Sequence, residues 1–133
     1  PFTGILWQEN ELLEFRWNGE KKYYRKLDPG QQHIWSSVTL YDTVTMNKRK
    51  SWFQEWIIKN AEPGWEEVMN FHLKSGDGDV KNDLLMNRED KVSTMSITST
   101  VITPDLISMN HLDIQTEKLS TQNLTIHKVI TIK

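Results

Sequence analysis

The spacing of apolar residues changes along this chain, and that change constrains the fold more than any other feature. In the first forty residues Leu13, Phe15 and Trp17 alternate with polar neighbours, which is the period of two of a half-buried β-strand. Between residues 43 and 60 the spacing is three to four, as on one face of a helix. That face consists of Val44, Trp52, Phe53, Trp56, Ile57 and Asn60. The chain must therefore combine strands with helices.

The first forty residues predict an antiparallel meander. We expect strands at residues 2–8, 13–17, 21–27 and 33–40. Asn18 and Gly19 form the dipeptide best suited to a tight hairpin turn, because both residues tolerate positive φ. The sequence Asp28-Pro29-Gly30 ends the strand that follows.

Two helices are expected in the middle of the chain, at residues 43–60 and 65–74, with a break at Pro63-Gly64. Either Asp42 or Thr43 can cap the first helix. In the second helix Val68, Phe71 and His72 are expected to face inward. Trp52, Phe53, Trp56 and Ile57 are expected to supply much of the contact between the helices and a sheet.

The tail returns to strands, at residues 92–102 and in a hairpin of residues 106–115 and 119–132. His111 and His127 lie on this hairpin as candidate cross-strand neighbours. Strands, two helices and strands again predict an α+β fold, an antiparallel sheet with two helices on one face. A chain of 133 residues has the size of one domain. Residues 1–133 are expected to be a single domain or, because the chain does not begin with methionine, the carboxyl-terminal part of a longer domain.

Composition excludes several functions. The net charge of -2 gives no electrostatic reason to expect nucleic acid, and basic clusters near residues 21–26 and 48–50 are expected to be solvated. Apolar runs are too short to span a membrane, and the start does not resemble a signal peptide. The chain has no cysteine, which excludes disulfides and thiolate sites and favours a reducing compartment. We therefore predict a cytoplasmic protein without a cofactor.

Residues 76–83 contain alternating glycine and aspartate, the least usual stretch of the chain. Three interpretations stay open: a loop whose Asp and Asn side chains bind their own backbone amides, a ligand contact, or a site for a hard cation. The stretch departs from an EF-hand, because Lys81 and Asn82 occupy an acidic position and the required glycine position. We expect residues 76–79 to form an ordered loop that abuts Asn82, Asn87 and Arg88 and helps form a polar pocket without holding a tight metal ion.

Polar residues able to converge are concentrated in this loop and in residues 33–41, and we expect the two segments to form one cleft. Arg88 can grip a carboxylate or phosphate, whereas a surface turn explains the same residue. Neither the serine and histidine of residues 33–41 nor any pair of histidines has the spacing of a nucleophile or zinc site. The candidate ligand-binding residues are Ser36, Ser37, His72, Asp77, Asp79, Asn82, Asn87 and Arg88.

Two blocks of sequence, in this order, resemble the carboxyl-terminal half of bacterial NRDE proteins, the transport-and-Golgi-organisation protein 2 family. The first block joins residues 33–41 to residues 48–53, and the second runs through residues 71–99. The resemblance as a whole covers about residues 1–100. It implies half of an αββα sandwich related to N-terminal-nucleophile hydrolases, and a link to haem trafficking and lipid homeostasis. Family members begin with Met-Cys and carry Asn-Arg-Asp-Glu in their first half; this chain has neither, and Asn87-Arg88-Glu89-Asp90 is not equated with that motif.

Three functions follow as hypotheses. The first is a domain of this type that binds a small molecule, related to haem or lipid by the resemblance. The second is part of an amide hydrolase whose nucleophile lies on a segment absent from this chain. The third is a homo-oligomeric interaction module that uses an exposed strand edge.

Overall fold

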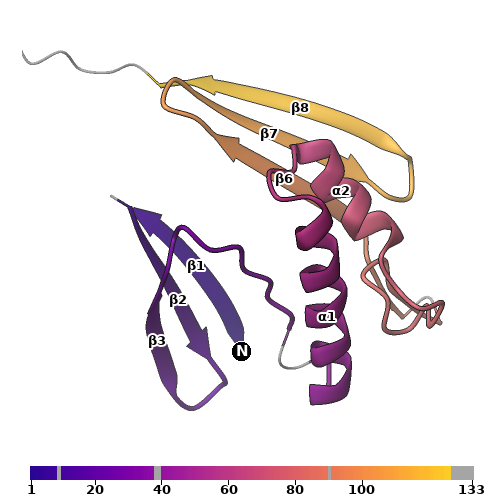
Figure 1. Cartoon of the computed structure of the whole chain (residues 1–133). Coiled ribbons are helices and arrows are strands. Elements are labelled where there is room, and N and C mark those ends of the chain that lie inside the picture. The colour runs from indigo at the N-terminus through magenta and orange to yellow at the C-terminus, as the bar shows by residue number, and fades with distance from the viewer. Residues whose placement is uncertain (9, 38–39, 90, 127–133) are drawn as a thin grey trace, which may run out of the picture. The chain divides into compact units, whose positions relative to one another are not determined.

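The computed structural model describes residues 1–8, 10–37, 40–89 and 91–126, which form two compact units, Pro1–Phe53 and Gln54–Lys133. Across these described residues there are three antiparallel sheets and two helices (Figure 1). The predicted α+β class is confirmed, with three separate sheets where the sequence suggested one. That residues 1–133 make a single domain stays a prediction.

The first unit contains the predicted meander. Strands β1 (Phe2–Gln8), β2 (Glu11–Trp17) and β3 (Lys22–Leu27) pair antiparallel in the order β1-β2-β3. In the β2–β3 turn only Gly19 takes a positive φ, of 106°. Asn18 closes the turn through its side chain, because its Oδ1 accepts hydrogen bonds from the backbone amides of Glu20 at 3.0 Å and Lys21 at 2.8 Å.

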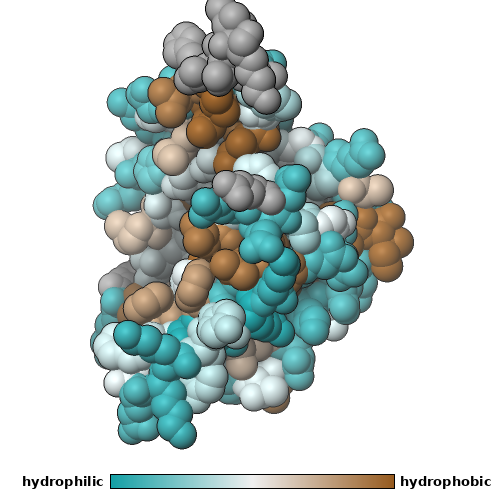
Figure 2. Space-filling model, turned by 90° about the vertical axis from the view of Figure 1, so that its left-hand side faces the viewer, coloured by the Kyte–Doolittle hydropathy of each residue, from teal (hydrophilic) through white to brown (hydrophobic). Residues whose placement is uncertain are grey.

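The alternation in the sequence predicts that the apolar face of this sheet is buried, but the structure buries Glu14 on the polar face. Phe15 and Trp17 are 38% and 37% exposed, whereas Glu14, the residue before Phe15, is only 3% exposed. Apolar side chains thus reach the surface, as Figure 2 also shows for the face of the molecule it presents. The polar face of the sheet is the one that another segment of the chain covers.

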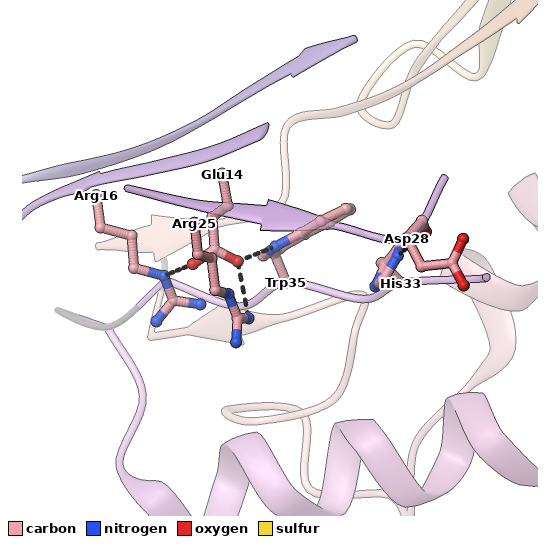
Figure 3. Close-up of polar contacts among 6 residues, drawn as sticks. All are labelled: Glu14, Arg16, Arg25, Asp28, His33 and Trp35. Carbon is pink, nitrogen blue, oxygen red and sulfur yellow. Dashed lines mark hydrogen bonds and ion pairs between the residues drawn. The ribbon is translucent and has the colours of Figure 1, made fainter. Parts of the chain in front are cut away.

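The segment that covers the polar face consists of residues 31–37. A strand was predicted at residues 33–40, but residues 33–37 have no regular structure. Side-chain hydrogen bonds hold it instead of a backbone ladder. The Trp35 indole donates to Glu14 Oε2 at 2.7 Å, and the His33 ring bonds the Asp28 carbonyl at 2.8 Å (Figure 3). The β-branched and aromatic composition was therefore a poor guide, because no strand edge pairs with this segment in the described part of the chain.

Helix α1 (Thr43–Lys59) starts where it was predicted, and its first eleven residues belong to the first unit and the rest to the second. Asp42 caps it, because Oδ1 accepts a hydrogen bond from the Thr45 amide at 2.8 Å. The inner face begins one residue later than expected, since Val44 is exposed and Thr45 is buried. Arg49 is also buried, with its guanidinium 3.7 Å from the centre of the Tyr41 ring.

The second unit packs helix α2 (Trp65–Lys74) against strand β6 (Ser96–Ile102). Phe71 is buried, as predicted, together with Met69. The centre of the Phe71 ring lies 4.7 Å from that of the half-buried Trp56 of α1, so Trp56 contributes to the same core. Val68 and His72 are half-buried.

The predicted terminal hairpin is present in the described residues, and the part of its second strand predicted at residues 127–132 lies outside them. Strands β7 (Leu106–Asp113) and β8 (Lys118–Thr125) pair antiparallel, and β6 pairs with the other edge of β7. The expected strand at residues 92–102 is divided into β5 (Val92–Ser93) and β6, and β5 pairs with β4 (Asn87–Arg88). Across from His111 lies Ser120, not another histidine, and His127 falls outside the described residues.

Candidate functional site

The predicted site residues are divided between the two units. Ser36 and Ser37 belong to the first unit, and the six others belong to the second. Their convergence in a single cleft stays a prediction.

Ser36 and Ser37 are half-buried at one end of the covering segment. They line a pocket of about 270 Å³ together with Trp35. The other lining residues are Pro1, Phe2, Thr3 and Ile5. This pocket holds hydroxyls beside aromatic groups but no charged side chain.

The Gly/Asp loop is held together by its own carboxylates. Asp83 Oδ1 accepts from the Asp77 amide at 3.0 Å, and Asp79 Oδ1 accepts from the Lys81 amide at 3.2 Å. A side chain at Gly76 would collide with the Asp83 carboxyl, since an added Cβ would lie 2.2 Å from its Cγ. Gly78 has φ of 91°, a conformation that favours glycine.

Arg88, on β4, contacts residues 81 and 82, which follow the 76–79 loop. Its Nε donates to the Lys81 carbonyl at 3.0 Å, and its Nη2 donates to Asn82 Oδ1 at 3.1 Å. Asn82 in turn donates to Asp79 Oδ2 at 2.8 Å, and the Asn87 amide donates to the Val80 carbonyl at 2.7 Å. These polar groups therefore form hydrogen bonds within this region of the chain. Within the described ranges, no three His, Cys, Asp or Glu side chains gather to hold a metal ion.

A larger pocket, of about 540 Å³, lies next to this loop in the second unit. Of the predicted site residues only Asn87 lines it, and His72 does not; the His72 ring instead meets the Phe71 ring edge-on, at 5.5 Å. The complete lining is Val80, Leu85, Met86, Asn87, Ser93, Thr94, Met95, Ile114 and Gln115. We name this the methionine pocket.

Sequence reasoning missed the methionine pocket because it treated residues 92–102 as one strand. Thr94 leaves the strand, and its amide donates to the Met86 carbonyl at 2.8 Å, while its Oγ1 accepts from the Met86 amide at 3.0 Å. The Ile114 amide donates to the Met95 carbonyl at 2.9 Å. Three chain segments thus meet at the pocket, and its wall is fixed by backbone hydrogen bonds. The sequence signal, Ser-Thr-Met inside a β-rich run, was too weak to show this.

The two methionines differ in exposure. Met86 is 6% exposed and forms part of the floor, whereas Met95 is 60% exposed at the rim. Unbranched methionine side chains adjust to differently shaped apolar groups. The pocket therefore has a fixed frame and an adaptable entrance.

Comparisons with protein-family models, with curated proteins and with solved structures gave no match. In the part of the chain that the structure describes, neither helix is long and apolar enough to cross a membrane.

Proposed function

We propose that this chain is the carboxyl-terminal half of an NRDE-like domain of a bacterial cytoplasmic protein, and that it binds a small, largely apolar molecule in the methionine pocket. The observation that carries the proposal is the pocket itself. Its volume of about 540 Å³ lies within the range of about 300–1,000 Å³ common for ligand sites. Five of its nine lining residues are apolar and four are polar, the mixture that such sites use.

The lining favours one class of ligand. None of the nine residues carries a charge, so an ionised group would lose its hydration there without a partner. Haem, with its two carboxylates, suits this pocket less well than an acyl chain that ends in an alcohol, ester or amide. Ser93 and Gln115 can hydrogen-bond such an end, while Met86 and Ile114 pack against the chain.

Calorimetric titration with monolaurin, an uncharged glyceryl ester, tests the proposal below the concentration at which the ester forms micelles. We expect saturable binding, and a rise in melting temperature because the ester binds the folded state. Met95→Gln should weaken binding at least about fivefold by placing an amide at the rim. Met109→Gln is the matched control, since Met109 is an exposed methionine of β7 outside the pocket, and it should leave the affinity unchanged.

Laurate and haemin serve as comparison ligands in the same titration. Both should bind more weakly than monolaurin because each carries a carboxylate. If haemin is the only ligand that saturates the protein, and if Met95→Gln weakens its binding, the hypothesis of a haem-related ligand replaces that of an acyl ligand. Equal losses in Met95→Gln and Met109→Gln would exclude the methionine pocket for either ligand.

The open apolar face of the β1–β3 sheet favours a second candidate. Phe2, Leu6, Phe15, Trp17 and Tyr24 are exposed on this face. An αββα sandwich would place a second sheet against it, as in an N-terminal-nucleophile amide hydrolase with its nucleophile on a preceding segment. Sequencing the full reading frame tests this: an upstream segment that starts with Met-Cys supports the hydrolase, and a start codon directly before Pro1 removes it.

A further inference from the structure

The first unit contains a charged cluster that the methionine pocket does not involve. Cross-strand pairing places Glu14 opposite Arg25 and Arg16 opposite Tyr23 on one face of β2 and β3. Glu14 Oε2 accepts from Arg25 Nη2 at 3.0 Å and from the Trp35 indole at 2.7 Å. Arg16 Nε forms an ion pair with Glu14 Oε1 outside hydrogen-bond geometry. One buried carboxylate thus positions two guanidinium groups.

Figure 3 shows both guanidinium groups on the same side of the strands, beside the Glu14 carboxylate. The side chains of Arg16 and Arg25 are 36% and 63% exposed, so solvent reaches them although Glu14 is covered. Two positive charges against one negative charge leave the cluster with a charge of about +1. Each guanidinium group carries five N–H donors, and the contacts with Glu14 involve one nitrogen of each, so donors remain for a ligand.

A pocket of about 460 Å³ opens on this cluster, and its lining is rich in hydrogen-bond donors. Besides the two arginines, Tyr23 brings a hydroxyl and Asn18 brings an amide whose oxygen is already used by the β2–β3 turn. The Asn18 NH₂ group therefore remains as a donor. The single carboxylate in the lining, that of Glu14, already has Trp35 and both arginines as partners.

We infer that this pocket binds the oxyanion of a small ligand, a phosphate or a carboxylate, through the forked guanidinium groups of Arg16 and Arg25. Guanidinium groups match the geometry of both oxyanions and form two parallel hydrogen bonds to each. Glu14 is a positioning residue: it holds the arginines side by side and does not touch the ligand. Burial raises the pKa of Glu14, but the Trp35 and Arg25 hydrogen bonds and the two arginine charges outweigh it and lower the pKa overall, so the carboxylate stays ionised at neutral pH.

An NMR titration of the full chain at pH 7 tests the inference, with the arginine Nε–H signals as the readout. Phenyl phosphate and benzoate present the two oxyanions on the same ring, and benzamide is the neutral control. We expect saturable shifts of the Arg16 and Arg25 signals with at least one oxyanion and none with benzamide. The tighter of the two ligands identifies the oxyanion. No saturable shift with either, or an equal shift with benzamide, would overturn the inference.

Variants separate this site from a general effect of charge. Arg25→Gln should weaken binding at least about tenfold, since it removes a charged bidentate contact. Lys26→Gln is the matched control, because Lys26 is the next residue of β3, lies on the opposite face and pairs with the exposed Glu11. It should change the affinity less than about twofold. If Arg25→Gln does not fold, Arg25→Lys keeps the charge without the fork and should still weaken binding. Equal losses at residues 25 and 26 would overturn the inference.

Discussion

Replacing Glu14 with glutamine should destabilise the protein, because the change keeps the shape of a buried side chain and removes its charge. Glu14 is 3% exposed and receives two hydrogen bonds and an ion pair. Breaking a fully buried ion pair costs about 3–5 kcal/mol. The arginine side chains are 36% and 63% exposed, however, and stay hydrated when the pair is lost, which reduces the cost. We expect the free energy of unfolding to fall by about 2 kcal/mol at pH 7.

Urea denaturation followed by circular dichroism measures this loss, and its pH dependence identifies the cause. The folded-state pKa of Glu14 lies below the usual 4.5. A depressed carboxyl pKa contributes stability that is fully present above the unfolded-state pKa and is lost as the pH falls through the folded-state pKa. The difference between wild type and Glu14→Gln should therefore be constant at neutral pH and shrink below about pH 4.5.

Glu11→Gln is the matched control for this experiment. Glu11 is also on β2 and also pairs with a basic residue, Lys26, but both side chains are more than half exposed. Exposed pairs contribute about 0.2–1 kcal/mol, so this control should cost at most about half as much. Equal costs for the two variants, or a Glu14→Gln cost that persists unchanged at low pH, would refute the reasoning.

Three further changes test packing and loop structure. Trp56→Ala should lower the free energy of unfolding by about 2 kcal/mol, less than at a fully buried position, because Trp56 is half-buried. Ile58 in the same helix is exposed, so Ile58→Ala should cost under about 0.5 kcal/mol, and urea titration measures both losses. Asp79→Ala removes two hydrogen-bond acceptor contacts and should lower the melting temperature, and adding EDTA to wild type should not; an EDTA-induced drop restored by calcium would instead reveal a metal site. Gly76→Ala should cost about 1–3 kcal/mol by displacing the Asp83 carboxyl, and hydrogen exchange should then show faster opening of the loop.

Local signals in the sequence predicted the regular elements well. The Asp42 cap, the Pro63-Gly64 break and the Asn18-Gly19 turn each act within a few residues, so their effect does not depend on the rest of the fold. The meander, both helices and the terminal hairpin followed from them.

Burial and the site depended on contacts between distant residues. Alternation on β2 could not show which face would be covered, and the Trp35 hydrogen bond to Glu14, across 21 positions, decided in favour of the polar face. The methionine pocket likewise forms where residues 80–87, 93–95 and 114–115 meet. The loop of residues 76–79 was predicted to abut Asn82 and Arg88. Asn82 donates to Asp79 directly, whereas Arg88 donates to Lys81 and Asn82, and these polar groups serve the structure of the loop region itself.

The methionine methyl groups offer the most direct test of ligand binding in the methionine pocket. The chain has five methionines, of which Met86 and Met95 line the pocket and the other three do not. In a protein labelled with ¹³C at the methionine ε-methyl groups, NMR titration with monolaurin should shift the Met86 and Met95 signals along one saturable curve. The signals of the remaining methionines, Met46, Met69 and Met109, should stay in place. Unchanged Met86 and Met95 signals, or equal movement of all five, would contradict the account.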